Sequence, residues 1–288
     1  MIGPIRSMLF VPGTREDRFA KAMSAGADAV VFDLEDSVGA GQKSKARSLV
    51  GEYLATANDD VLRLVRLNAA HTPEGDADLK FFGDVRGFSG LILPKVENAS
   101  TVEFVARTFT GFGGVDAAPP LLLLLETPRA ILRAAEIAAA DAPVAALMLG
   151  AEDLTASLAV ERTVDGEELV FARGQLAMAA AAVGADAIDA VFTNLLDTAS
   201  LRRDCERARG LGFRGKMAIH PKQVEVINDV FTPAAADVER ATRVVAAYET
   251  ARAAGEGVTT LDGRMVELPV VERAHRILAR ATGRRTAG

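Results

Sequence analysis

The sequence lacks the residues on which several classes of protein depend. Its 288 residues include one cysteine (Cys205), no tryptophan and three histidines. A single cysteine excludes an intrachain disulfide, which is typical of the reducing cytosol. Lysine and arginine number 33 against 39 aspartates and glutamates, so the chain also lacks the basic excess of nucleic-acid-binding proteins. We therefore expect a cytoplasmic protein that has no nucleic-acid partner.

The chain also lacks a hydrophobic run long enough to cross a membrane. The first apolar run spans only Met8 to Val11, and the longest strongly hydrophobic stretch, Leu121 to Leu125, lies between Pro120 and Glu126. A membrane-spanning helix needs about 20 apolar residues, and the core of a signal peptide about 7 to 15. We expect no membrane association.

The sequence does contain eight short apolar runs, each followed by polar or glycine-rich residues. The runs are mostly continuous rather than alternating, which is typical of strands that are buried on both faces of a parallel sheet. Segments with helical spacing lie between them, for example at 99–108, 127–140 and 198–210. The apolar runs cover residues 8–11, 29–32, 61–67, 91–93, 121–125, 144–149, 187–192 and 217–219.

Eight repeats of a strand and a helix predict an α/β fold of the (β/α)8 type, the TIM barrel. An open Rossmann-like sheet is the alternative, but the glycine cluster at 111–114 lacks the preceding strand and the following helix start that dinucleotide binding requires. We expect the barrel at residues 1–222. A C-terminal helical extension at 223–288, with a loop at 255–262, is predicted to act as a lid or to contact a neighbouring subunit.

Two carboxylates, Glu126 and Asp153, follow successive predicted strands. In such barrels the chemistry takes place at the carboxyl ends of the strands, where neighbouring ends lie close enough for two carboxylates to share one ion. Carboxylates with open water positions suit Mg²⁺. The alternative for each acid is a helix N-cap or a solvated loop position.

Two basic residues also end predicted strands. Arg66 closes an apolar strand, where an unpaired guanidinium would be costly to bury, so it requires an anionic partner. That partner is either a substrate carboxylate or an internal acid, Glu35 or Asp36. Lys95 follows Pro94 and could form a Schiff base, as in metal-independent aldolases, or an internal ion pair.

Seven phrases at these strand ends form an ordered set of motifs. They are RSMLFVPGTREDRFAKA, DAVVFDLEDSV, VRLN, LPKVE, LLLLLETP, LMLGAEDL and KMAIHPKQ. Together they resemble the citrate lyase β-subunit-like family, within the HpcH/HpaI aldolase/citrate lyase group that includes malyl-CoA and citramalyl-CoA lyases. The likeness extends from Arg6 to about His275.

The resemblance implies a TIM barrel that assembles as a homotrimer or hexamer and binds Mg²⁺. The family's metal ligands are the Glu of its LET motif and the Asp of its G-x-E-D-L motif, which match Glu126 and Asp153. Glu126 is thereby also placed at the substrate. The arginine of the R-x-N motif, which holds a substrate carboxylate and serves in catalysis, matches Arg66.

Further site residues are implied by the same resemblance. The acids of the D-L-E-D motif, Glu35 and Asp36, line the pocket as candidate catalytic residues, either of which could reprotonate the enolate in place of the tail acid. Pro12 and Gly13 contribute to the side that binds CoA or the acyl carrier. The family's tail motif, M-[IV]-D-x-P, supplies a catalytic aspartate from a neighbouring subunit. Here the tail reads MVELP, so Glu267 stands in its place with one additional methylene.

The resulting hypothesis is a Mg²⁺-dependent carbon–carbon lyase. It would cleave a 3-hydroxy-acyl-CoA, such as malyl-CoA or citramalyl-CoA, into acetyl-CoA and an α-keto acid, or form the ester from these two compounds. One alternative is a citrate lyase β subunit that acts on a citryl-acyl-carrier thioester within a complex. The other alternative is an aldolase that uses a Lys95 Schiff base.

Overall fold

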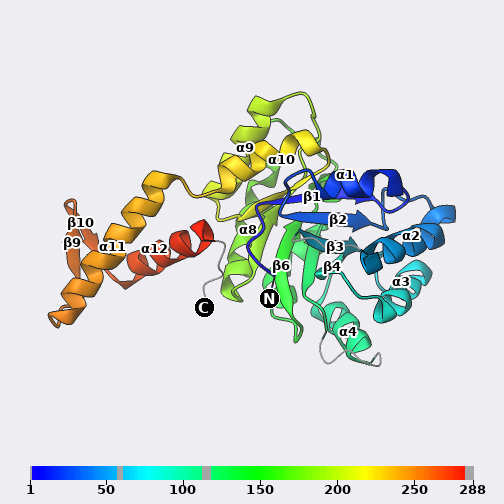
Figure 1. Cartoon of the computed structure of the whole chain (residues 1–288), viewed down its shortest axis with the longest axis horizontal. Coiled ribbons are helices and arrows are strands. Elements are labelled where there is room, and N and C mark those ends of the chain that lie inside the picture. Colours follow the sequence, from blue (N-terminus) through cyan, green and yellow to red (C-terminus); the bar gives the residue numbers. More distant parts are fainter. Residues whose placement is uncertain (1, 57–60, 112–117, 283–288) are drawn as a thin grey trace. The chain divides into compact units, whose positions relative to one another are not determined.

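The computed structural model describes residues 2–56, 61–111 and 118–282 (Figure 1). Eight parallel strands follow one another around a closed barrel, and β8 returns to pair with β1 through Ser7 and Lys216. This confirms the (β/α)8 prediction and excludes an open sheet; most of the glycine cluster at 111–114 lies outside the described residues. The barrel strands are β1 (Ser7–Pro12), β2 (Ala29–Asp33), β3 (Leu62–Arg66), β4 (Gly90–Leu93), β5 (Leu121–Leu125), β6 (Val144–Leu149), β7 (Asp186–Asp189) and β8 (Gly215–Ala218).

Helices follow the strands and cover the outside of the barrel (Figure 1). A polar side chain caps the first turn of several of them: Thr72, Asn98 and Thr127 each accept a hydrogen bond from the main chain three residues further on. The helices of this part are the 3₁₀ segments η1 (Glu16–Arg18), η2 (Ala40–Gln42) and η3 (Glu167–Leu169), with α1 (Phe19–Met23), α2 (Lys43–Thr56), α3 (Pro73–Asp84), α4 (Ala99–Thr110), α5 (Pro128–Leu132), α6 (Ala134–Ala138), α7 (Ala151–Leu158), α8 (Val170–Ala182), α9 (Thr198–Gly210) and α10 (Pro221–Phe231).

The barrel strands divide their side chains between two hydrophobic clusters. In β5, Leu122 and Leu124 belong to the cluster that fills the barrel, whereas Leu121, Leu123 and Leu125 pack against the helices. Because successive strand residues point to opposite faces, both faces of each strand need apolar side chains. This is the physical reason why the runs are continuous in the sequence.

Four buried charges lie between the barrel and its helices, away from the barrel interior. Arg173 on α8 donates two hydrogen bonds of 2.9 Å to the two carboxylate oxygens of Asp189 on β7. It donates a third, of 2.7 Å, to Asp204 on α9. Lys216 of β8 binds the same two acids at 2.5 and 2.7 Å. Two cations and two anions thus neutralise one another, as buried charges must.

The chain divides into two compact units, Met1–Phe231 and Thr232–Gly288. The division follows α10 rather than residue 222, because α10 packs on α9, β1 and β8 and so belongs to the barrel. The second unit consists of α11 (Ala235–Ala253), β9 (Thr259–Leu261), β10 (Arg264–Val266) and α12 (Leu268–Ala281). The role of this extension as a lid or subunit contact stays a prediction.

The second unit contains a β-hairpin where the sequence predicted only a loop. Strands β9 and β10 pair antiparallel around Asp262 and Gly263, which both have positive φ, at 52° and 73°. An Asp-Gly pair favours such two-residue turns, and this was the signal in the sequence.

Within the described residues, no helix is sufficiently long and apolar to span a membrane.

Candidate active site

A cavity of about 450 Å³ lies at the carboxyl ends of the barrel strands. Its charged lining includes Asp36, Arg66, Glu126 and Asp153. Its apolar lining includes Phe10, Leu124, Val191 and Met217. A few convergent polar groups in a largely apolar cavity are the usual composition of a small-molecule site.

Strand alternation explains why these polar side chains enter the cavity. Arg66 lies two residues after Leu64, and Glu126 two residues after Leu124, both of which belong to the cluster inside the barrel. Asp33 has the same relation to Val31. Side chains two positions apart on a strand share a face, so the last inward position of each of these strands carries a charge.

The guanidinium of Arg66 is held mainly by Asp33. Nε and Nη2 donate to the two carboxylate oxygens of Asp33 at 2.6 and 2.8 Å. Nη1 lies 3.1 Å from Glu35 Oε2 and 3.2 Å from Asp36 Oδ2, and the Phe10 ring lies 5.3 Å away. The internal partner expected for Arg66 is therefore present, and the strongest one is Asp33, to which the sequence assigned no role.

Asp33 is fixed from several sides. Its side chain is 2% exposed, and it accepts hydrogen bonds from the main chain of Glu35 and from the hydroxyl and main chain of Ser37. Burial favours the neutral acid, but the bonds from Arg66 and Ser37 outweigh it and lower the pKa of Asp33. The two bonds from Arg66 to Asp33 in turn keep the guanidinium in one orientation.

Glu35 and Asp36 differ in their surroundings. The Glu35 carboxylate is buried and pairs with Lys95 Nζ at 2.9 Å as well as with Arg66, yet burial raises its pKa. The Asp36 side chain is 57% exposed and lines the cavity. Of the two acids, only Asp36 is therefore placed to exchange its partner for a ligand.

Glu126 is a buried carboxylate in an electrostatically unfavourable place. Burial, followed by the charges of Glu35 and Asp153, raises its pKa to about 8. Its Oε1 accepts a 2.7 Å hydrogen bond from the main-chain N–H of Lys95. Thr127, not Glu126, is the N-cap of α5, so Glu126 does not serve as a helix N-cap.

The start of α7 brings Asp153 and Gly150 to Glu126. Asp153 is half-buried in the first turn of α7 and lines the cavity. Gly150 packs so closely on Glu126 that a Cβ there would lie 2.3 Å from Glu126 Cβ and 2.8 Å from Oε2. A glycine is thus required for Glu126 to occupy its position.

The donor set suits one hard divalent cation. Within the described ranges, no three side chains of the His, Cys, Asp and Glu types are arranged as a metal cage. Two carboxylates, Glu126 and Asp153, converge instead, and a cation between them would offset the negative charge that adds to burial in raising the pKa of Glu126. Mg²⁺ is commonly held in this way, by one or two carboxylates with water and substrate oxygens.

The other sequence-predicted residues lie in four different places. Pro12 lines the cavity, whereas Gly13 joins β1 to β2, where its N–H donates to the Asp33 carbonyl at 2.8 Å. Lys95 contacts Glu35 from the end of β4. Glu267 belongs to the second unit, where it is exposed and precedes α12.

Comparisons with known proteins relate the whole chain to one family. The model of the HpcH/HpaI aldolase/citrate lyase family matches residues 6–221. A (3S)-malyl-CoA thioesterase of Cereibacter sphaeroides is 37% identical over 279 residues, which cover 96% of this chain and 95% of that protein. A citrate lyase subunit beta of Escherichia coli is 37% identical over 282 residues, which cover 96% of this chain and 93% of that protein.

Solved structures give the same relationship. The CitE protein of Mycobacterium tuberculosis, in complex with magnesium, acetoacetate and coenzyme A, is 35% identical with a TM-score of 0.79, and the match covers 98% of each chain. A citrate lyase beta subunit of the same organism, with oxaloacetate and magnesium, has 35% identity and a TM-score of 0.69, covering 80% of this chain and 98% of that one. The chain therefore belongs to the HpcH/HpaI aldolase/citrate lyase family, as its motifs predicted.

Proposed function

We propose that the protein is a Mg²⁺-dependent carbon–carbon lyase acting on a 3-hydroxy-acyl-CoA such as malyl-CoA or citramalyl-CoA. The reaction would yield acetyl-CoA and an α-keto acid, or join them. The observation that carries the proposal is the convergence of Glu126, Asp153 and Arg66 on one cavity. Relatives crystallised with magnesium together with oxaloacetate, or with acetoacetate and coenzyme A, support the metal and the substrate class.

Glu126 and Asp153 would hold the ion. When bound, Mg²⁺ supplies positive charge that stabilises the negative charge developing on the substrate oxygens. The two carboxylates must be ionised for this purpose, and the Lys95 N–H favours the ionised form of Glu126. Water and substrate would complete the coordination.

Arg66 would orient the substrate carboxylate through one edge of its guanidinium. Asp33 occupies Nε and Nη2, so Nη1 is the group that can change partners. The exposed Asp36 side chain is the weakest of the internal partners, at 3.2 Å. A substrate carboxylate would replace Asp36 on Nη1 and leave Asp33 in place.

Cleavage needs a proton to leave the substrate hydroxyl and another to reach the α-carbon of the released thioester enolate. Asp36, released from Arg66 and already in the cavity, is the proposed proton-transfer group of the barrel. Glu35 keeps Arg66 and Lys95 in place. Glu267 would reprotonate the enolate from a neighbouring subunit of a homotrimer or hexamer.

The test is an assay of the purified chain alone. With Mg²⁺ and malyl-CoA or citramalyl-CoA, we expect acetyl-CoA together with glyoxylate or pyruvate. The reaction should stop on chelation with EDTA and in the variant Glu126→Gln. Absence of cleavage without added partner proteins would contradict the stand-alone enzyme and favour a citrate lyase β subunit, which acts on an acyl-carrier thioester.

Thioester hydrolysis is the second candidate, because relatives of equal identity are (3S)-malyl-CoA thioesterases. The products distinguish it: hydrolysis releases malate and CoA, whereas the lyase releases a keto acid and acetyl-CoA. A Lys95 Schiff base has less support. Hydrogen bonding and charge from Glu35 outweigh the effect of burial and raise the pKa of Lys95, which keeps the amine protonated and non-nucleophilic.

A further inference from the structure

Lys95 has an unusual main-chain conformation at the edge of the site. It follows Pro94 at the end of β4 with φ of 54°, in the left-handed region. Residues other than glycine, asparagine and aspartate are uncommon there, and they persist where the surrounding structure holds them. An observed outlier of this kind beside a candidate metal ligand calls for a physical explanation.

The main chain of Lys95 reaches the metal carboxylate. The left-handed turn directs its N–H onto Glu126 Oε1 at 2.7 Å. Gly150 restrains the other side of the same carboxylate, close to Oε2. Glu126 thus lies between a main-chain donor on one side and the main chain of a glycine on the other.

The ammonium of Lys95 reaches different acids. Nζ lies 2.9 Å from Glu35 Oε1 and 3.7 Å from Asp36 Oδ1, and the other oxygen of Glu35 faces Arg66 Nη1 at 3.1 Å. Lys95 and Arg66 pair with the carboxylates of Asp33, Glu35 and Asp36, and those of Glu126 and Asp153 line the same cavity. The ammonium therefore offsets part of a large negative charge.

We propose that Lys95 is a positioning residue whose two ends act on metal binding in opposite directions. Its main-chain N–H strengthens binding, because it holds the Glu126 carboxylate in place through a 2.7 Å hydrogen bond to Oε1. Its ammonium weakens binding, because it adds positive charge, but it holds Glu35 against Arg66 and so keeps the arginine ready for an anionic substrate. This inference rests on the proposed function. It identifies Lys95 as a residue that lowers the affinity for the metal while raising the affinity for the substrate.

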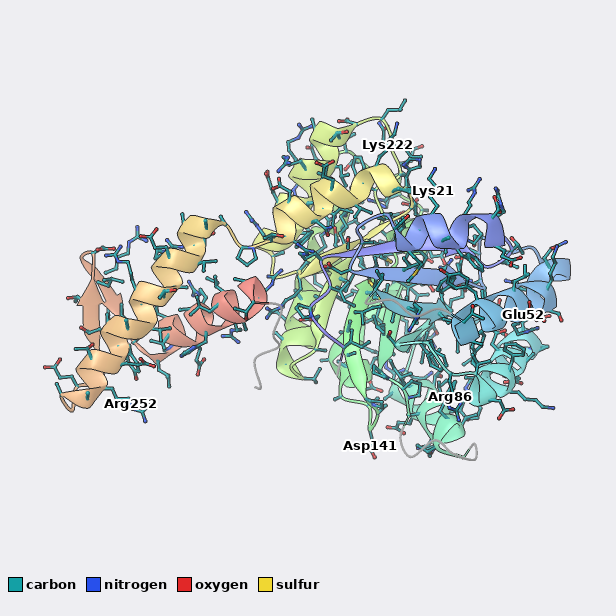
Figure 2. All side chains as sticks on the ribbon, in the orientation of Figure 1. Lys21, Glu52, Arg86, Asp141, Lys222 and Arg252 are labelled. Atoms are coloured by element: carbon teal, nitrogen blue, oxygen red, sulfur yellow. The ribbon has the colours of Figure 1, made fainter. Side chains whose placement is uncertain are left out.

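Three variants of the 288-residue chain separate the effect of the Lys95 main chain from that of its ammonium. Lys95→Gly removes the ammonium and accommodates positive φ. Lys95→Val removes the ammonium but disfavours positive φ, since β-branched residues are genuine outliers there. Lys95→Arg retains the charge. Lys21→Ala, at an exposed lysine of α1 labelled in Figure 2, is the matched control for losing a lysine charge outside the site.

The readout is the dissociation constant for Mn²⁺, measured by electron paramagnetic resonance without substrate, followed by titration of oxaloacetate into the metal-bound protein. We expect Lys95→Gly to bind Mn²⁺ about two- to tenfold more tightly and the keto acid about tenfold more weakly than the wild type. Lys95→Val should bind Mn²⁺ about tenfold more weakly than Lys95→Gly. Lys95→Arg and Lys21→Ala should match the wild type.

Equal Mn²⁺ affinity in Lys95→Gly and the wild type would overturn the role of the ammonium. Equal affinity in Lys95→Gly and Lys95→Val would overturn the role of the main chain. Weaker binding of both metal and keto acid by Lys95→Gly would indicate a merely structural residue and also contradict the inference. These results leave the lyase proposal standing, whereas a wild-type protein that binds no Mn²⁺ would contradict the proposed function itself.

Discussion

Asp33 determines which nitrogen atoms of the Arg66 guanidinium remain available to a ligand. Replacement by asparagine keeps the shape of the side chain but removes the negative charge that fixes Nε and Nη2. We expect Asp33→Asn to weaken binding of the keto acid about 10- to 100-fold, because hydrogen bonds between charged groups are worth about 1.5–3 kcal/mol. The measurement is a titration of oxaloacetate at saturating Mg²⁺.

The matched control for Asp33 is a similar pair at the amino ends of the strands. There Arg6 donates to both oxygens of Asp28 at 2.7 and 2.9 Å. Asp28→Asn should leave keto-acid affinity unchanged, since Arg6 and Asp28 lie before β1 and β2 rather than at the cavity. An equal loss in both variants would mean that the effect of Asp33 is general destabilisation.

Glu126 should make metal binding depend on pH. Burial and the charge of Glu35 raise its pKa to about 8, and a metal binds only the ionised carboxylate. Below this pKa a proton must leave, so the apparent Mg²⁺ affinity should rise about tenfold per pH unit up to about 8 and then level off. Calorimetric titration between about pH 6 and 9 checks this, and a flat profile would contradict it.

The junction between β6 and α7 places a main-chain atom where any side chain would collide with Glu126. We expect Gly150→Ala to weaken Mg²⁺ binding about 10- to 100-fold, since a Cβ at 2.3 Å from Glu126 Cβ must displace the carboxylate. The fold should survive, because the collision is confined to one residue, Glu126. Mg²⁺ calorimetry and a thermal melt measure the two effects.

Gly174 on α8 offers the control for this substitution. Nothing lies within 4 Å of a Cβ at that position, and alanine favours a helix by about 0.5–1 kcal/mol over glycine. Gly174→Ala should therefore keep the metal affinity and slightly raise the melting temperature. If Gly150→Ala behaves in the same way, the close approach to Glu126 has no functional consequence.

The charges between the barrel and its outer helices join four elements: β7, β8, α8 and α9. Removal of one cation leaves an acid buried without full compensation, so Lys216→Met should lower the free energy of unfolding by about 3–5 kcal/mol. Urea unfolding measures this, with Lys222→Met, at an exposed lysine labelled in Figure 2, as the control. Unchanged stability would show that packing, not charge pairing, holds these elements together.

At the scale of the whole molecule, Glu267 is predicted to act on a neighbouring subunit. Glu267→Ala and Arg66→Lys should each lose cleavage activity, because each removes one part of every active site. Hybrid oligomers of the two variants should regain activity, since one site then combines an intact Arg66 with an intact Glu267. Mixed and unmixed preparations are compared in the CoA-ester assay, and no recovery on mixing would contradict action between subunits.

The barrel could be predicted from the sequence because each of its signals is local. Continuous apolar runs indicate strands buried on both faces, and parallel strands all end at the same edge of the barrel. The acids and the arginine after the third, fifth and sixth runs were therefore expected at one cavity, where Arg66, Glu126 and Asp153 lie. The two carboxylates already suited Mg²⁺, whereas the CoA ester came from the resemblance of whole motifs.

The paired carboxylates, their arginine and the fold that gathers them could thus be predicted from the amino-acid sequence. The contacts of Asp33 with Arg66, of the Lys95 main chain with Glu126, and of Gly150 with Glu126 are visible only in the folded structure. These contacts join segments more than 20 residues apart, and the contact between Lys95 and Glu126 also depends on one positive φ angle. Distances and angles of this kind arise only when the closed barrel fixes its strand ends against one another.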